Sequence, residues 1–329
     1  MLEVVTGARP IAAAIRQLRR RLVGMPMRGV SISWQGGGGV RGDIVWLRDE
    51  RFWWRLDAAR HPGRYGLMFG LARNAPTHGE SATCEINLPV VGADRRLAGA
   101  LVRDDAGTLY LAHSGKIGGG RVGRHRQAFR AFLAGGNWQR VRWPDGRDSE
   151  LLLIAPLDGP RLARQIGRFV QAVHRYKRQA IDGAAPMPAA LVVPVADHGT
   201  ARGRRRSAED AGVLAALCDR GLLLDALGEE LSRRGLVGDG TSTPLFTEPG
   251  QPVRLVELET STSRAVLERT VGRLVLRGVD ASEPPRAILV VPEAATPVLA
   301  VLARYGVTLV RYRWQRARPV FIGLDAALG

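Results

Sequence analysis

The sequence predicts two domains, a strand-rich α+β half followed by an α/β half. The chain has 329 residues, and a domain usually holds about 100–200 residues, so two domains are expected. Six of the seven tryptophans precede residue 144, in the half whose pattern predicts most of the strands. Residues 182–206 are rich in proline, alanine and glycine and end in consecutive arginines, which is typical of a linker. We therefore expect an α+β domain at 1–181, a linker at 182–206 and an α/β domain at 207–329.

The first half begins with an amphipathic helix. Residues 8–23 place Ile11, Ile15, Leu18 and Leu22 at helical spacing and put arginines on the other face, so a helix with a basic outer face is predicted. Alternation and turn signals predict a β-hairpin between residues 30 and 47. The pattern then predicts strands at 51–57, 82–88, 97–103, 108–113, 138–143 and 151–156, a loop-rich stretch at 58–81, and helices at 124–134 and 160–178.

The second half has a different rhythm, with longer helices between short apolar runs. Ser207 and Asp210 have the spacing of a capping box, which predicts a helix start. The pattern predicts helices at 208–219, 222–234, 262–277 and 294–304, and strands at 243–247, 253–258, 286–292 and 307–312. A hairpin followed by helix, strand, helix and strand is an α/β layout.

The charge balance is the strongest signal in the composition. The chain has 48 Lys+Arg against 31 Asp+Glu, a net charge of +17, and a pI near 11.3. Only Lys116 and Lys177 are lysines, and arginine suits phosphate because its planar fork donates two hydrogen bonds at once. A GC-rich genome also favours arginine codons, but codon bias alone need not unbalance the sign. The composition therefore predicts a nucleic-acid partner, with DNA as the first choice.

The sequence offers little support for a membrane or secreted protein. No stretch approaches the roughly 20 apolar residues of a membrane span, and the first residues lack the long apolar region of a signal peptide. Cys84 and Cys218 are far apart, which suggests neither a disulfide framework nor a metal site. We expect a cytoplasmic protein without a membrane partner, and a homodimer is compatible with the sequence.

Residues 255–278, "LVELETSTSRAVLERTVGRLVLRG", resemble a strand and the following helix of a PD-(D/E)XK nuclease, the restriction-endonuclease-like fold. The resemblance covers residues 207–320. Such nucleases carry one acid on the first hairpin strand and an acid-x-Lys triplet on the second. The acids hold Mg²⁺, and the lysine orients or activates the attacking water. The resemblance implies a metal-dependent DNA endonuclease with Glu257 at the acidic position and Mg²⁺ as the cofactor if the site is active.

The chain departs from that pattern at the catalytic positions. Glu259 replaces the lysine, Arg273 replaces a glutamine of the following helix, and Pro244 or its neighbours stand where the first acid is expected. Other acids nearby can substitute for the missing one. The expected catalytic residues are Glu257, Glu259 and Glu230, and the expected metal ligands are Glu257 and Glu248. Asp239 is a further candidate. We expect a degenerate nuclease site. Alternatively, the two glutamates line a solvated strand face.

A second candidate site lies in the first half, at residues 110–129. His113 and Lys116 lie at the end of a predicted strand, and a run of glycines then leads to a predicted helix start. Glycines let the backbone approach a phosphate closely, and the N–H groups at a helix N-terminus bind it. The predicted nucleic-acid-binding residues are His113, Lys116, Gly118, Gly119, Gly120, Arg121, Arg124, Arg126, Arg204, Arg205 and Arg206. The alternative is a basic surface loop. A hydrolase triad of His113, Ser114 and Glu85 is not expected, because adjacent strand residues point to opposite faces.

The tryptophans of the first half leave two alternatives open. They can stack on a flipped or modified base, or they can simply fill the core. Residues 85–121 also resemble uncharacterised modules that are fused to nuclease-like domains. The sequence thus predicts a DNA-binding protein of restriction-endonuclease-like type that recognises modified DNA and whose nuclease domain is degenerate. The alternative is a non-catalytic DNA- or RNA-binding module of a larger assembly.

Overall fold

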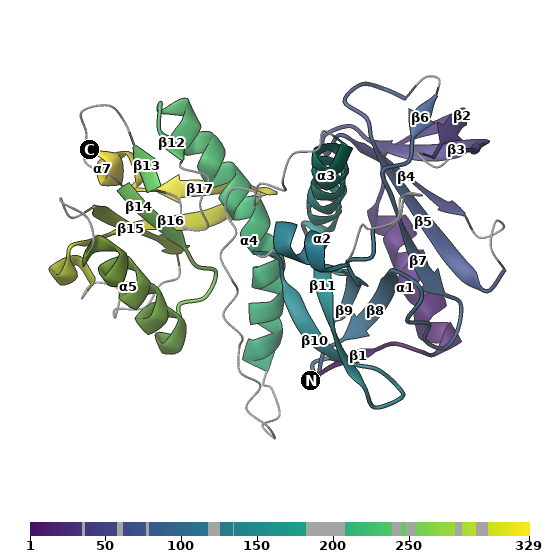
Figure 1. The fold of residues 1–329 in the computed structure, drawn as a ribbon, viewed down its shortest axis with the longest axis horizontal. Coiled ribbons are helices and arrows are strands. Elements are labelled where there is room, and N and C mark those ends of the chain that lie inside the picture. The colour runs from purple at the N-terminus through teal and green to yellow at the C-terminus, as the bar shows by residue number, and fades with distance from the viewer. Residues whose placement is uncertain are drawn as a thin grey trace. The chain divides into compact units, whose positions relative to one another are not determined.

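The computed structural model divides the chain into two compact units (Figure 1). It describes residues 1–329 except 35–36, 58–61, 77–78, 118–125, 134, 182–207, 239–244, 248–253, 280–284 and 294–301. Along the chain, the boundary between the units falls within helix α4 (Ala208–Arg233), between Cys218 and Asp219. The predicted linker, 182–206, lies outside the described residues.

A closed five-stranded barrel forms one part of the first unit. Its strands follow the order β1 (Leu2–Val4), β10 (Trp138–Arg142), β11 (Asp148–Pro156), β9 (Leu109–His113) and β8 (Gly99–Arg103). The three-residue strand β1 runs parallel to β10 and antiparallel to β8. The sequence does not predict β1, because three residues show no periodicity and both partner strands lie far along the chain.

The other sheet of the first unit curls back on itself. Its order is β6 (Glu80–Ser81), β2 (Met25–Ser33), β3 (Gly39–Leu47), β4 (Phe52–Asp57), β5 (Arg64–Leu71) and β7 (Cys84–Pro89). Only Ala82 and Thr83 separate the two edge strands. The Ala82 N–H donates to Ser33 O on β2, and the Thr83 N–H donates to Phe69 O on β5. The curled sheet encloses an apolar cluster that includes Trp46, Trp53 and Met68.

Strand β5 is absent from the prediction, which made residues 58–81 a loop-rich stretch. Gly66 and Gly70 interrupt the apolar alternation that would have indicated a strand. The structure explains Gly70, because a Cβ there would lie 2.4 Å from two ring carbons of Trp53. The glycine is needed where the large indole crosses the neighbouring strand.

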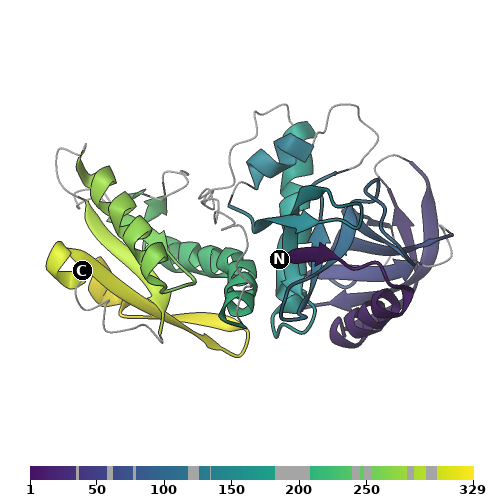
Figure 2. The same cartoon turned by 90° about the horizontal axis from the view of Figure 1, so that it is seen from below.

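Helices cover the sheets of the first unit: α1 (Ala8–Arg21), α2 (Arg126–Phe132) and α3 (Leu162–Ile181). The predicted apolar face of α1 is confirmed, since Ile11, Ile15 and Leu18 are buried. The helix is held at its end by Trp54, whose Nε1 donates to Leu22 O at 3.0 Å. Figure 2 shows α1 at the outside of the unit.

The second unit is built on a six-stranded mixed sheet. Its order is β12 (Val237–Gly238), β13 (Leu245–Thr247), β14 (Arg254–Leu258), β15 (Arg286–Pro292), β16 (Val307–Gln315) and β17 (Arg318–Ile322). Strands β14, β15 and β16 are parallel to one another, and the remaining pairs are antiparallel. The described part also contains α5 (Arg264–Val279), the 3₁₀ helix η1 (Ala303–Tyr305) and α7 (Leu324–Leu328).

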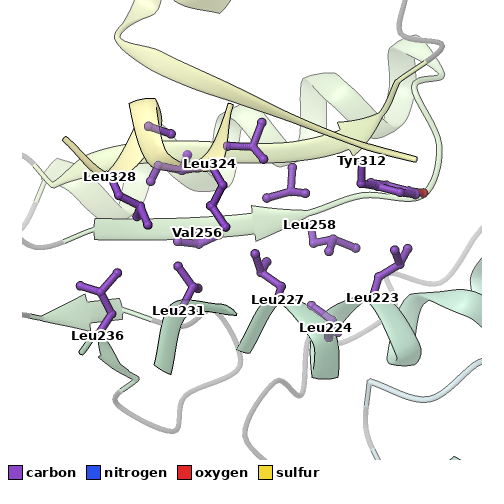
Figure 3. Packing of buried hydrophobic residues seen from close by; sticks show 14 residues of the cluster. Leu223, Leu224, Leu227, Leu231, Leu236, Val256, Leu258, Tyr312, Leu324 and Leu328 are labelled. Atoms are coloured by element: carbon purple, nitrogen blue, oxygen red, sulfur yellow. The ribbon is translucent and has the colours of Figure 1, made fainter. Parts of the chain in front are cut away.

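The two faces of this sheet have separate cores. Leucines of α4 pack on Val256 and Leu258, as Figure 3 shows. Leucines of α5 pack on the opposite face, against Leu255 and Leu289. The period-2 alternation of a strand produces this division, because Leu255 and Val256 point to opposite sides.

The prediction of two helices at 208–219 and 222–234 is wrong, because α4 continues through Gly221. A glycine inside a helix costs about 1 kcal/mol. Both parts of α4 bury apolar side chains, Leu214 and Cys218 in the first unit and Leu223 and Leu227 in the second. This packing outweighs the local penalty of the glycine. Most of the helix predicted at 294–304 lies outside the described residues.

The mixed α/β character and the strand-rich first half are confirmed. In the described part of the chain, no helix is both long and apolar enough to cross a bilayer.

Candidate functional site

The two glutamates stand at the carboxyl end of β14. Glu257 lies within the strand, and Glu259 follows directly after it. Both share the strand face of Leu255, which is the face that α5 covers. Glu257 is only 2 % exposed. The alternative of a solvated strand face therefore does not describe Glu257, although Glu259 is partly open to solvent.

An arginine of α5 lies between the two carboxylates. The Arg273 Nε donates to Glu257 Oε1 at 3.3 Å, and its Nη2 donates to Glu259 Oε1 at 2.9 Å. The Thr270 hydroxyl donates to the same Glu259 oxygen at 2.7 Å and accepts from Arg273 Nη2 at 3.1 Å. Thr270 and Arg273 reach one target because residues three apart lie on the same face of a helix.

The Arg273 guanidinium offsets the repulsion between the two carboxylates. Two neighbouring carboxylates repel each other unless a cation stands between them. In a metal nuclease that cation is a divalent ion, whereas here a guanidinium bridges both acids. Among the residues that the structure describes, no group of three His, Cys, Asp or Glu side chains is arranged to hold a metal. With Arg273 in this position the described residues do not fit Mg²⁺.

Glu230 is not brought together with Glu257 and Glu259. It lies near the end of α4, which covers the opposite face of the sheet. Its carboxylate pairs with Arg234 at 2.6 Å and with Arg233 at 2.8 Å. Hydrogen bonds from Arg234 and Arg233, in that order, hold the pKa of Glu230 below its usual range. Glu230 therefore acts in a surface ion-pair network. The other substitute acids, Glu248 and Asp239, and Pro244 lie outside the described residues.

Two arginines also lie on the face of the sheet that α5 covers. On β16, Arg311 and Arg313 are exposed and alternate with Val310 and Tyr312, which point into the opposite core. Arg313 faces Glu293 at 3.7 Å. The carboxyl ends of parallel strands are the usual ligand-binding edge of an α/β sheet. At this edge the second unit presents a closed acidic pair and two exposed arginines.

His113, predicted to contact nucleic acid, is buried. It is 1 % exposed, its ring lies 5.1 Å from that of Phe169, and its Nδ1 accepts a 2.9 Å hydrogen bond from the Gly115 N–H. Burial lowers the pKa of His113 to about 3, so the imidazole is neutral at physiological pH. A buried neutral ring offers no contact to phosphate, and we leave His113 out of the interface.

Lys116 and Arg126 have local partners. The Lys116 Nζ donates to Arg95 O at 2.8 Å from an exposed position. Arg126 donates to Glu150 O, and the neighbouring Arg130 forms an ion pair with the Glu150 carboxylate. The remaining predicted binding residues lie outside the described part of the chain: Gly118, Gly119, Gly120, Arg121, Arg124, Arg204, Arg205 and Arg206.

Most tryptophans of the first unit serve the core. Trp46, Trp53 and Trp54 are buried, and the indole N–H groups of Trp46 and Trp54 donate to backbone carbonyls. Trp34 is half-buried, and its Nε1 donates to Glu85 Oε1 at 2.8 Å. Trp143 is buried as well, and burial favours a packing role over a stacking pocket for the four buried rings.

The set of predicted binding residues omitted the exposed arginines of α1. The sequence does show a basic face on this helix, but the predicted binding site was placed at the glycine-rich stretch.

No family model matches this chain, and searches of curated proteins and of solved structures likewise find no match.

Proposed function

We propose that this chain is a cytoplasmic DNA-binding protein whose second unit has a restriction-endonuclease-like arrangement and binds without cutting. The observation that carries the proposal is the bridge from Arg273 to Glu257 and Glu259. The guanidinium takes the place between the acids where a nuclease needs a metal ion, and it cannot activate water as a metal-bound hydroxide does.

The order of elements supports the nuclease-like arrangement. Helix α4 precedes the antiparallel strands β12, β13 and β14, and α5 then leads to β15, which is parallel to β14. This is the helix, hairpin, helix and strand order that the sequence resemblance implies. Glu257 lies on the second strand of the β13–β14 hairpin and Glu259 directly follows it, in line with the resemblance.

Charge supports a polyanionic partner. The net charge is +17, and Arg311 and Arg313 are exposed on β16, two strands from the acidic pair in the same sheet. A neutralised acidic pair removes the local repulsion that phosphates would otherwise meet at this edge. Both cysteines are free thiols, which suits a reducing compartment such as the cytoplasm.

The test compares binding with cleavage on the same samples. Labelled duplex DNA should bind at about 50 mM salt and weaken steeply by about 200 mM, because phosphate contacts release counterions. Binding should be equal in EDTA, Mg²⁺ and Mn²⁺, and supercoiled plasmid should stay uncut in all three. Metal-dependent nicking that disappears in Glu257→Gln would show an active nuclease. If no DNA binds even at low salt, the DNA-binding proposal fails.

A further inference from the structure

The N-terminal part of the chain concentrates positive charge without any acid to balance it. Residues 4–42 contain seven arginines and no aspartate or glutamate. Five of these arginines lie on α1: Arg9, Arg16, Arg19, Arg20 and Arg21. Positive charge this dense in one short segment creates a local field that attracts polyanions.

Three of the arginines form a row along the outer face of α1. At 3.6 residues per turn, Arg9, Arg16 and Arg20 fall within about 40° of one another around the helix axis. At 1.5 Å per residue, the row from Arg9 to Arg20 is about 16 Å long. Ala13 lies in the same row, so no bulky side chain stands between the cations. All three arginines are exposed.

The row has no carboxylate partner among the described residues. Several exposed arginines elsewhere are paired: Arg96 with Asp94, Arg142 with Asp148 and Arg264 with Glu268. No such ion pair involves the three arginines of the α1 row within the part of the chain that the structure describes. Their guanidinium groups are therefore available to an external anion.

The burial of the other helix face decides the kind of partner. A basic amphipathic helix binds a membrane by placing its apolar side among the lipid chains. In α1 that side is taken up by the core, since Ile11, Ala14, Ile15 and Leu18 are buried. Only the cationic row is left for contact. Such a surface fits a regular array of phosphates, and arginine forks hold phosphate oxygens in pairs.

We propose that Arg9, Arg16 and Arg20 form the surface by which the first unit grips the phosphate backbone of duplex DNA. The contact is independent of base sequence and sets the strength of binding. This inference rests on the proposed DNA-binding function, and it adds the residues that make the contact.

Two variants of equal charge test the surface. Arg9→Gln/Arg16→Gln/Arg20→Gln removes the row, and Arg96→Gln/Arg142→Gln/Arg264→Gln removes three arginines that are already paired with acids. Affinity for labelled duplex DNA is measured over a salt series. The first variant should weaken binding about ten-fold or more and lower the slope of log K against log salt by about 2–3, since each lost phosphate contact contributes about 0.9. The second should bind nearly as the unaltered chain does.

Each outcome has a distinct meaning. Equal weakening in both variants would show that binding follows net charge and that α1 is not the surface. Unchanged binding in the first variant would also overturn the inference while leaving DNA binding intact, whereas failure of the unaltered chain to bind would overturn the proposed function itself. Circular dichroism checks that both variants stay folded. Vesicles of anionic phospholipid form a further arm, and row-dependent binding to vesicles but not to DNA would identify a membrane surface instead.

Discussion

Arg273 on α5 donates to Glu259 at 2.9 Å, directly after the carboxyl end of β14. The same guanidinium reaches Glu257 at 3.3 Å, and this second acid is almost wholly buried. A carboxylate at such a position needs a compensating charge. The contact therefore links the stability of the second unit to the neutralisation of the acidic pair.

Replacing Arg273 should destabilise the second unit and expose a latent cation site. In Arg273→Ala the buried Glu257 charge loses its partner, and we expect a loss of about 2–4 kcal/mol in the free energy of unfolding. Mn²⁺ should then raise the melting temperature of the variant but not that of the unaltered chain, since a ligand stabilises the state that binds it. The control is Arg264→Ala, which breaks the exposed pair with Glu268. A variant as stable as this control, with no response to Mn²⁺, would contradict the assigned role of Arg273.

Two glycine-to-alanine substitutions should change the free energy of unfolding in opposite directions. A Cβ at Gly70 would lie 2.4 Å from the Trp53 ring and 2.6 Å from Ser81 O, so Gly70→Ala should cost about 3 kcal/mol. Gly228 lies within α4 with no atom within 4 Å of an added Cβ, so Gly228→Ala should stabilise by about 0.5–1 kcal/mol. Denaturant unfolding followed by tryptophan emission and by circular dichroism measures both. Equal effects would show that the close packing at Gly70 is relaxed in solution.

The buried histidine should make the first unit less stable in mild acid. Burial lowers the pKa of His113 from 6.5 to about 3. Between these values the unfolded chain binds the extra proton, so the stabilising contribution is complete above about pH 6.5 and is lost as the pH falls toward 3. From pH 7 to pH 5 this one group should remove about 2 kcal/mol.

The substitution that isolates this effect is His113→Gln, which cannot titrate. Its unfolding free energy should change less between pH 7 and pH 5 than that of the unaltered chain. Burial and nearby cations also lower the pKa of His174 on α3, so His174→Gln should reduce the pH dependence as well, but less than His113→Gln does. If His113→Gln keeps the full pH dependence, the proton is bound elsewhere.

Asn137 should hold the first part of α4 on the barrel. Its Nδ2 donates to Leu214 O at 3.3 Å and to Cys218 Sγ at 3.2 Å, while its Oδ1 accepts from Gln139 at 2.7 Å. Asn137→Ala removes these three buried hydrogen bonds, at a cost of about 1–3 kcal/mol. Amide exchange in residues 208–218 should become faster, and the exposed Asn74→Ala provides the control. Unchanged protection of residues 208–218 would show that Asn137 does not secure the helix.

Local patterns in the sequence were sufficient for the elements that carry their own periodicity. The apolar spacing of α1 and the alternation around Glu257 and Glu259 are properties of neighbouring residues, so the helix, the strand and the shared face of the two acids were all predictable. Strand β5 was missed because its inner positions include Gly66 and Gly70, which leave no apolar signal. Gly70 leaves room for the Trp53 ring and Gly66 for the backbone carbonyl of Asp57, both on the neighbouring strand β4.

The chemistry of the candidate sites was decided by packing between distant residues. The sequence placed an arginine at position 273, but only the docking of α5 on β14 brings its guanidinium between the two glutamates. His113 precedes lysine, glycine and arginine residues that are typical of an anion site. In the folded chain, however, its ring packs on Phe169 and belongs to the core. Periodicity predicts the face of a helix or strand on which a side chain lies. Its partner and its charge state depend on the residues that the folded chain packs against that face.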